Sequence, residues 1–386
     1  MKKVLLLLVF CFSFGLTFSE TLSDSARVSI LSCGSGKELY AQFGHTAIRL
    51  TDPSLNIDVA FNYGTFNFAT EGFYYKFIKG LTDYELGLDF SNDFFIRYNV
   101  NQIPVWEQEI NLTKKEKQQL FDALMVNYEP ANRFYRYNFV YDNCATRPRD
   151  MIESVLGGKI IYPNRNVKNT FRELVGGCVG TDTWTKFGLD FVLGSSADKV
   201  PTPRERMFLP LELMAYFQGA KRPDGKPLIL KTSNVVIVPI EKDTTPFLLK
   251  PVAVCFAVLF LIGVVSYIGR KKEMIWLDAI LFTIAGIMGV IVFYISYFSI
   301  HPIVAGNFNL LWVQPLHLLF VLLLPFKKLR KALSYYQLLN VIAILVALAG
   351  FVVLPQQFNI AFLPLMLLYL MRGLLYIRNQ RISIIN

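Results

Sequence analysis

The sequence contains Phe43-Gly44-His45-Thr46-Ala47 and, in a later segment, Tyr141-Asp142-Asn143-Cys144-Ala145-Thr146-Arg147. The first motif leads into a predicted strand, and the second leads into a predicted helix. A histidine and a cysteine in these settings are the groups expected of a thiol nucleophile and its base. No other histidine precedes His301, so His45 is almost the only candidate base for Cys144 in this part of the chain.

The hydrophobic pattern around these motifs predicts an α+β domain in which strands precede helices. The stretches that alternate or run apolar like strands are residues 27–31, 46–50, 58–63, 84–89 and 105–110. Helices are predicted over residues 113–127, 150–156 and 204–217. The first of these helices opens with a capping-box sequence, Thr113 to Glu116. Pro148 fits best in a first helical turn, which places Cys144 in the turn before the second helix.

Long apolar runs replace this mixed pattern from about residue 247, which indicates a membrane region. Five candidate spans cover residues 247–268, 275–298, 309–325, 338–354 and 358–377. The first 19 residues have the basic start and apolar run of a secretory signal peptide. We therefore expect a signal peptide at 1–19, an exported domain at 20–246 and an all-α membrane bundle at 247–386. The exported domain divides into a core over about 27–158 and a wrapping or linking segment over 159–246.

The charge distribution gives the orientation of these segments. The net charge is +10 at pH 7, yet the exported domain has nearly equal numbers of basic and acidic residues. The surplus lies at alternate ends of the spans, at residues 270–272, 327–331 and 378–381, which the positive-inside rule assigns to the cytoplasm. The domain is therefore expected in the periplasm of a bacterial inner membrane protein, and no nucleic-acid partner is expected.

Cysteine usage excludes a disulfide framework, because the chain has only five cysteines. Cys11 belongs to the signal peptide, and Cys255 lies in a span. In an oxidising compartment two of the other three can pair, and Cys33 with Cys178 is the pairing that leaves Cys144 free. Three separate buried thiols are the alternative. No His/Cys cluster has zinc-ligand spacing, so neither a metal nor a cofactor is expected.

Cys144 and His45 also have plain structural interpretations. Cys144 can be a buried cysteine at a helix start, although the helix dipole at that position would favour its thiolate. His45 can be a satisfied core histidine, although Gly44 permits the close approach of another backbone. The pair together favours a site more than either residue does alone.

The motifs resemble a known family. A histidine-bearing strand followed by an Asn-Cys helix start is similar to the circularly permuted papain-like fold of the lecithin retinol acyltransferase group, except that Ala145 and Thr146 follow the cysteine. More closely, Leu31-Ser32-Cys33-Gly34, Phe43-Gly44-His45-Thr46, Phe61-Asn62-Tyr63-Gly64 and the Cys144 motif resemble the periplasmic domain of the Lnb family of bacterial lipoprotein N-acyltransferases. The five-span tail is similar to that family's architecture.

The resemblance implies transfer of an acyl chain from a membrane phospholipid to the α-amino group of a lipidated lipoprotein N-terminal cysteine. Cys144 would attack the ester, His45 would act as base, and a thioester would be the intermediate. The family match offers Asn62, or less well Asp58, as the residue that orients the imidazole. The backbone N–H of Cys144 is the natural oxyanion donor.

Substrate contacts are expected from residues next to the nucleophile. The three candidates are Asn143, Arg147 and Arg149. The arginines can hold a lipid phosphate by paired hydrogen bonds, or they can be solvated charges on the helix surface.

Two further groups of residues invite a membrane interpretation. Aromatic residues crowd positions 66–77 and can form a lip that contacts lipid, or belong to the core. Polar residues gather between the second and third spans, at His301, Asn307, Asn309, Gln314 and His317. They can form an entry site for lipid or lipoprotein, or cap the spans and bond neighbouring ones.

Two other functional classes fit the same residues. A membrane-anchored cysteine amidase or peptidase acting on cell-wall peptides would need a water-filled cleft. A non-enzymatic envelope receptor or scaffold would not need Cys144 near His45. Five spans exceed what an anchor requires, which favours lipid chemistry.

Overall fold

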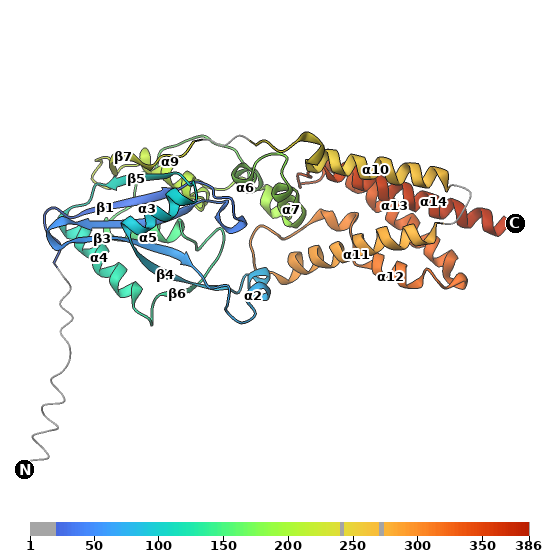
Figure 1. The fold of residues 1–386 in the computed structure, drawn as a ribbon, viewed down its shortest axis with the longest axis horizontal. Helices are drawn as coiled ribbons and strands as arrows, with labels where there is room; N and C mark the ends of the chain where they lie inside the picture. Colours follow the sequence, from blue (N-terminus) through green and yellow to red (C-terminus); the bar gives the residue numbers. More distant parts are fainter. Residues whose placement is uncertain (1–20, 240–242, 270–273, 386) are drawn as a thin grey trace, which may run out of the picture.

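The computed structural model describes residues 21–239, 243–269 and 274–385, so the expected signal peptide lies outside the described residues. The molecule is elongated, with a sheet at one end and long helices at the other (Figure 1). The sequence prediction of an α+β domain followed by a helical membrane region is confirmed.

The sheet is antiparallel and has seven strands in the order β6-β4-β3-β2-β1-β5-β7. Its strands are β1 Arg27–Cys33, β2 His45–Asp52, β3 Ile57–Thr65, β4 Asp83–Phe90, β5 Val105–Ile110, β6 Phe134–Arg136 and β7 Ile229–Val236. The five predicted strands are all present and lie side by side. The two strands that the sequence pattern missed, β6 and β7, form the edges.

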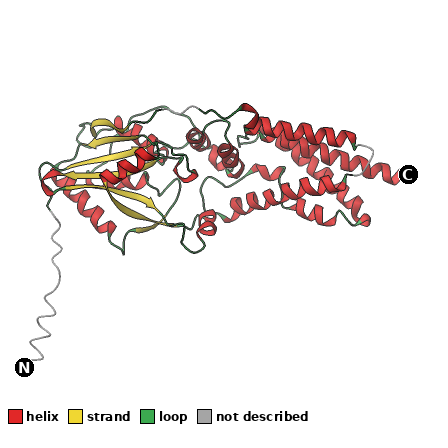
Figure 2. Cartoon of the chain, in the orientation of Figure 1, coloured by secondary structure: helices red, strands yellow, loops and turns green. Residues whose placement is uncertain are grey.

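Helices cover both faces of the sheet (Figure 2). Helices α4 (Lys114–Tyr128), α5 (Thr146–Val155) and α9 (Pro210–Gln218) share one apolar core with Ile48, Leu50 and Phe61. Helix α3 (Ser91–Val100) covers the other face, where it packs against Ala47. Neighbouring positions on β2 thus face opposite layers, as the two-residue period of a strand requires.

The predicted helix boundaries hold where a cap fixes them. The capping box of α4 is formed, since Glu116 Oε2 accepts from Thr113 N at 2.7 Å and Thr113 Oγ1 accepts from Glu116 N at 3.3 Å. The helix predicted over 204–217 is instead two helices, α8 (Pro203–Arg206) and α9. Pro210 opens α9, and its missing N–H favours a new first turn over a continuous helix.

The membrane region contains α10 (Pro251–Ile268), α11 (Ile275–Phe298), α12 (Leu316–Leu323), α13 (Arg330–Val353) and α14 (Phe362–Ile385). Three helical segments in the described residues are long and apolar enough to cross a membrane: residues 251–268, 275–298 and 327–353. The predicted third span, residues 309–325, is not one continuous helix. Pro315 stands at the N-cap of α12, which follows the short 3-10 helix Phe308–Leu311 and spans only eight residues.

Polar residues between α11 and α12 join the two parts of the molecule. Asn307 Nδ2 donates to Phe191 O at 2.8 Å, and Asn309 Nδ2 donates to the same oxygen at 3.1 Å. Phe191 belongs to α7 (Trp184–Val192), which follows α6 (Phe171–Val179). His317 is instead buried in the bundle, where its Nδ1 lies 2.6 Å from the Tyr336 hydroxyl. These contacts correspond to bonding within the protein, the second of the two sequence interpretations.

Candidate active site

His45 begins β2 at a point that only glycine can precede. Gly44 has φ +78°, and a Cβ there would lie 2.6 Å from Cys33 O. Cys33 is also the residue opposite His45 in the β1–β2 register. The close approach of the two strands therefore explains the glycine and fixes the histidine at the sheet end.

A chain of hydrogen bonds orients the imidazole. His45 Nε2 lies 3.1 Å from Asn62 Oδ1, and Asn62 Nδ2 donates to Asp89 Oδ2 at 2.8 Å and to Ala60 O at 3.2 Å. Asp89 is in turn paired with Arg97 of α3. Of the two residues that the resemblance offered, Asn62 is the one that contacts the imidazole, whereas Asp58 is paired with Arg49. Asp89 was not singled out in the sequence.

This pairing selects one tautomer of the histidine. Asn62 Oδ1 is only an acceptor, so His45 carries its ring proton on Nε2. The lone pair then lies on Nδ1. No hydrogen bond involves Nδ1 among the residues that the structure describes. Nδ1 is therefore the nitrogen that can accept a proton from a nearby thiol.

Cys144 lies where β2 and β3 separate. The ladder between these strands ends at the pair Ala47–Asn62, and β3 is irregular around Gly64. A Cβ on Gly64, whose φ is +91°, would lie 3.5 Å from Cys144 Cβ. The Thr46 N–H lies close enough to the Cys144 sulfur to lower the pKa of the thiol. The thiol is therefore held at the end of β2, next to the residue that follows His45.

The His45 imidazole and the Cys144 thiol lie near the same end of β2, but they come from opposite faces of the sheet. His45 shares the α3 face with Asn62, whereas Cys144 leads into α5 on the other face. Among the described residues, no hydrogen bond joins the thiol to the imidazole. Catalytic hydrogen bonds are often long before substrate binds, so this arrangement is compatible with a nucleophile and base.

Burial dominates the electrostatics of both groups. It raises the pKa of Cys144 to about 11, although the Thr46 N–H and the cysteine's own N–H act in the opposite direction. Burial also lowers the pKa of His45, which the Asn62 hydrogen bond only partly offsets. The expectation that the helix dipole favours the thiolate is therefore outweighed. Both groups are neutral at pH 7.

Asn143 holds the turn that contains Cys144 instead of reaching into open space. Its side-chain oxygen accepts from Ala145 N at 2.8 Å and from Thr146 N at 3.0 Å. Its amide donates to Phe139 O at 2.7 Å and Phe208 O at 3.0 Å. The side chain is buried, and its bonds are made within the chain, which favours a positioning role over the predicted substrate contact. Helix α5 begins at Thr146, as Pro148 indicated.

The two arginines also have partners within the protein. Arg147 makes a paired interaction with both carboxylate oxygens of Asp142 and lies 3.6 Å above the centre of the Tyr135 ring. Arg149 is buried and donates to Asp150 at 2.8 Å and to Arg204 O at 2.9 Å. Arg149 is therefore not a surface charge, and neither guanidinium is arranged as the free phosphate clamp that the sequence suggested.

Tyr135 is a candidate site residue that the sequence did not reveal. Its hydroxyl is buried and has no hydrogen-bond partner in the described part of the chain. A Cβ added to Gly64 would lie 3.9 Å from the Tyr135 hydroxyl and 3.5 Å from Cys144 Cβ. The hydroxyl and the cysteine side chain are therefore neighbours. A buried, unpaired donor is rare and requires an explanation. Its proximity to the thiol makes it a candidate donor to a bound group.

Disulfide bonding does not involve this site. Cys33, Cys144, Cys178 and Cys255 are all free thiols. Cys33 packs on the α3 face, whereas Cys178 packs in a separate cluster with α6. The structure thus has separate thiols, the second alternative derived from the sequence.

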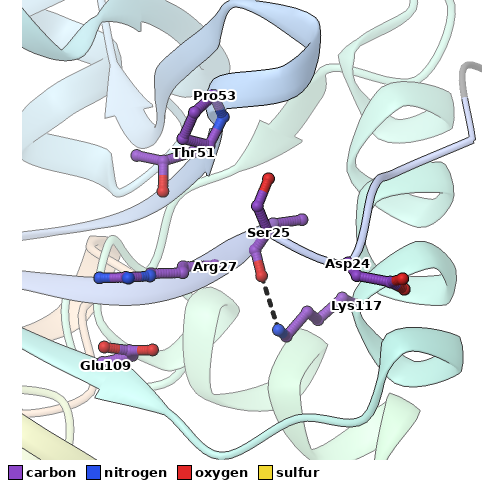
Figure 3. Close-up of a pocket in the computed structure, with 8 residues that line it drawn as sticks. Asp24, Ser25, Arg27, Thr51, Pro53, Glu109 and Lys117 are labelled. Atoms are coloured by element: carbon purple, nitrogen blue, oxygen red, sulfur yellow. Dashed lines mark hydrogen bonds between the residues drawn. The ribbon is translucent and has the colours of Figure 1, made fainter.

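A pocket of about 510 Å³ lies elsewhere in the domain (Figure 3). Its lining includes Arg27 and Thr51, which pair with each other at the start of β1 and the end of β2. His45 lies at the opposite end of β2, about 20 Å away at the rise of a strand. The pocket is therefore not part of the candidate active site.

The fold and site define a membrane protein whose N-terminal α+β domain holds a thiol at the end of a histidine-bearing strand. Residues 18–175 match a family model described as the Lnb N-terminal periplasmic domain, and residues 241–381 match one described as the Lnb transmembrane domain. Together these matches cover most of the chain, which belongs to the Lnb family. Searches of curated proteins and of solved structures found no match.

Proposed function

We propose that this protein is a lipoprotein N-acyltransferase of the bacterial inner membrane with its active site in the periplasm. It moves an acyl chain from a membrane phospholipid, through a Cys144 thioester, to the α-amino group of a lipidated N-terminal cysteine. The observation that carries this proposal is the Cys144 thiol close to Thr46, the residue that follows His45 on β2, together with the hydrogen bond by which Asn62 orients the His45 imidazole. We further propose that the exported domain is a permuted papain-like domain and that the membrane region has five spans.

The first half-reaction forms the thioester. Nδ1 of His45 takes the thiol proton as the Cys144 sulfur bonds to the ester carbonyl carbon. The oxyanion accepts hydrogen bonds from the Cys144 N–H and from the Tyr135 hydroxyl. The C–O bond then breaks, and the leaving alkoxide takes the proton from His45 and departs as lysophospholipid.

The second half-reaction consumes the thioester. The lipoprotein amine attacks the thioester carbon, and His45 takes a proton from the nitrogen. The C–S bond breaks, an amide is released, and the proton returns to the sulfur of Cys144. Atoms and charge balance without a metal or redox cofactor. Because the lysophospholipid leaves before the amine enters, the kinetics are ping-pong.

The test is the N-terminal mass of a reporter lipoprotein in cells that have no other N-acyltransferase. We expect Cys144→Ala to leave the reporter amine free. Cys178→Ala, which removes another partly exposed thiol of the same domain, should leave acylation intact. Full acylation in the Cys144→Ala cells would exclude the mechanism. Unaltered lipoproteins together with altered cell-wall peptides would instead identify an amidase.

A further inference from the structure

Exposed aromatic side chains surround α2 (Phe73–Lys79) at the membrane end of the domain. Phe68 is 52% exposed and Tyr74 is 71% exposed, and Tyr40, Tyr75 and Phe77 are exposed with them. Phe73 is buried among these residues. Contiguous exposed apolar groups on a folded domain mark a site of interaction with a partner or a membrane.

The aromatic residues form a continuous path toward the nucleophile. Ring centres are separated by 6.1 Å from Phe77 to Phe73, by 5.6 Å from Phe73 to Phe66 and by 5.1 Å from Phe66 to Tyr84. Phe68 lies beside the path, 4.8 Å from Phe66. We call these five residues the aromatic path.

The inner end of the aromatic path lies close to Cys144. Phe66 and the Cys144 side chain pack against the same apolar core, to which Tyr84 belongs. Tyr84 also lies opposite Tyr135 in the β4–β6 register, and a Cβ on Gly64 would lie 3.9 Å from the Tyr135 hydroxyl and 3.5 Å from Cys144 Cβ. An apolar chain that followed the path would therefore end near the sulfur.

The outer end of the aromatic path is fixed to a membrane helix. Lys79 O accepts from Ile300 N at 3.0 Å, and Phe77 O lies 2.8 Å from His301 Nε2, just beyond the end of α11. Figure 1 shows α2 at the end of α11 that faces the sheet domain. Lys76 and Lys79 lie in the last turn of α2. Positive charge at this level of a membrane favours contact with a phospholipid phosphate.

We propose that the aromatic path binds the acyl chain of a membrane phospholipid and delivers its ester to Cys144, with Lys76 and Lys79 facing the phosphate. The proposal rests on the proposed function and names its lipid-binding residues. The occupant is a lipid because the path is lined by aromatic rings along its length, begins beside a spanning helix and ends at Tyr84, in the core against which Cys144 packs. A lipid in the path also keeps water from the thioester, which a transferase requires.

The test uses the full chain with Cys144→Ala, reconstituted in vesicles that contain a phosphatidylethanolamine with a diazirine in its acyl chain. We expect photocrosslinks to Phe66, Phe68 or Phe73. Adding Phe68→Ser should weaken this crosslinking about fivefold. Leu230→Ser, which changes a residue 60% exposed on the distant edge strand β7, is the matched control.

Two results would overturn the proposal: crosslinks confined to the spanning helices, or equal losses in the Phe68 and Leu230 variants. The proposed function is read separately, by mass spectrometry of the unsubstituted chain in the same vesicles. Crosslinks on the path without acylated Cys144 would retain the lipid site and reject the thioester. An acylated Cys144 without crosslinks on the aromatic path would reject the lipid route and leave the proposed function intact.

Discussion

The resting state of Cys144 leads to a quantitative prediction. Burial moves its pKa from 9.0 to about 11. The thiolate fraction at pH 7 is then about one in ten thousand, about a hundredfold below that of the unshifted thiol. Only the thiolate reacts rapidly with an alkylating agent. We therefore expect iodoacetamide to modify Cys144 about a hundredfold more slowly than an ordinary cysteine at pH 7, with a rate that rises about tenfold per pH unit up to about pH 10.

The assay is timed alkylation of the full chain in detergent, followed by mass spectrometry of the peptide that contains Cys144. His45→Gln is the informative variant. If the resting pair is neutral, the substitution should leave the alkylation rate nearly unchanged while acyl transfer is lost. Rapid alkylation that is flat between pH 6 and 8, and that falls in the His45 variant, would reveal a preformed thiolate–imidazolium pair. Such a result would refute the reasoning from burial.

Three other predictions follow from the site and the domain contact. Because burial lowers the pKa of His45 from 6.5, the base stays neutral into mild acid, and the acidic limb of kcat/KM should lie below pH 6.5, as a pH–rate profile would show. Tyr135→Phe should lower kcat by about 100-fold without lowering the melting temperature, because it removes an oxyanion donor that has no partner at rest. Unchanged kcat with a lower melting temperature would contradict that role. Gly194→Ala would place a Cβ against Ala305 O, so it should weaken the contact between the segment after α7 and the link after α11 and expose that contact to protease. Gly188→Ala is the control, because its Cβ would meet nothing within 4 Å and should stabilise α7 by about 0.5–1 kcal/mol.

The sequence predicted those parts of the fold that local pattern controls. The central strands alternate or run apolar, and the Thr113 cap marks the start of α4. It missed β6 because three residues carry too little pattern. It missed β7 because a run of four polar residues, 231–234, interrupts its apolar pattern at the edge of the sheet. Edge strands are held by backbone hydrogen bonds to their neighbour, so their side chains need not show the alternating apolar pattern of a central strand.

The candidate site divides in the same way. Cys144 and His45 stand in short motifs with a cap residue or glycine beside them, so their own pattern could single them out, whereas Asn62 was offered by the resemblance to the Lnb family. Asp89 and Tyr135 could not be found, because their positions depend on register. Asp89 lies opposite Ala60 across β3 and β4, which brings its carboxylate to the Asn62 amide.

The sequence also could not identify long-range partners of charged or amide side chains. Arg149 lies one turn from the nucleophile, which suggested a phosphate ligand. Its guanidinium instead bonds Arg204 O, a carbonyl from the segment that wraps over α5. Asn143 reaches Phe208 O in the same segment. The segment over 159–246 therefore stabilises the nucleophile turn as well as linking the domain to the membrane helices.

The polar residues after α11 show how this attachment constrains the proposed reaction. Their position suggested a lipid entry site, but Asn307 and Asn309 bond the backbone of α7, and His301 bonds that of α2. Helices α2 and α7 are thus fixed to the same short link. A domain held at two points cannot easily tilt to lower Cys144 into the lipid. In the proposed reaction the acyl chain therefore moves to the thiol, and we expect it to follow the aromatic path.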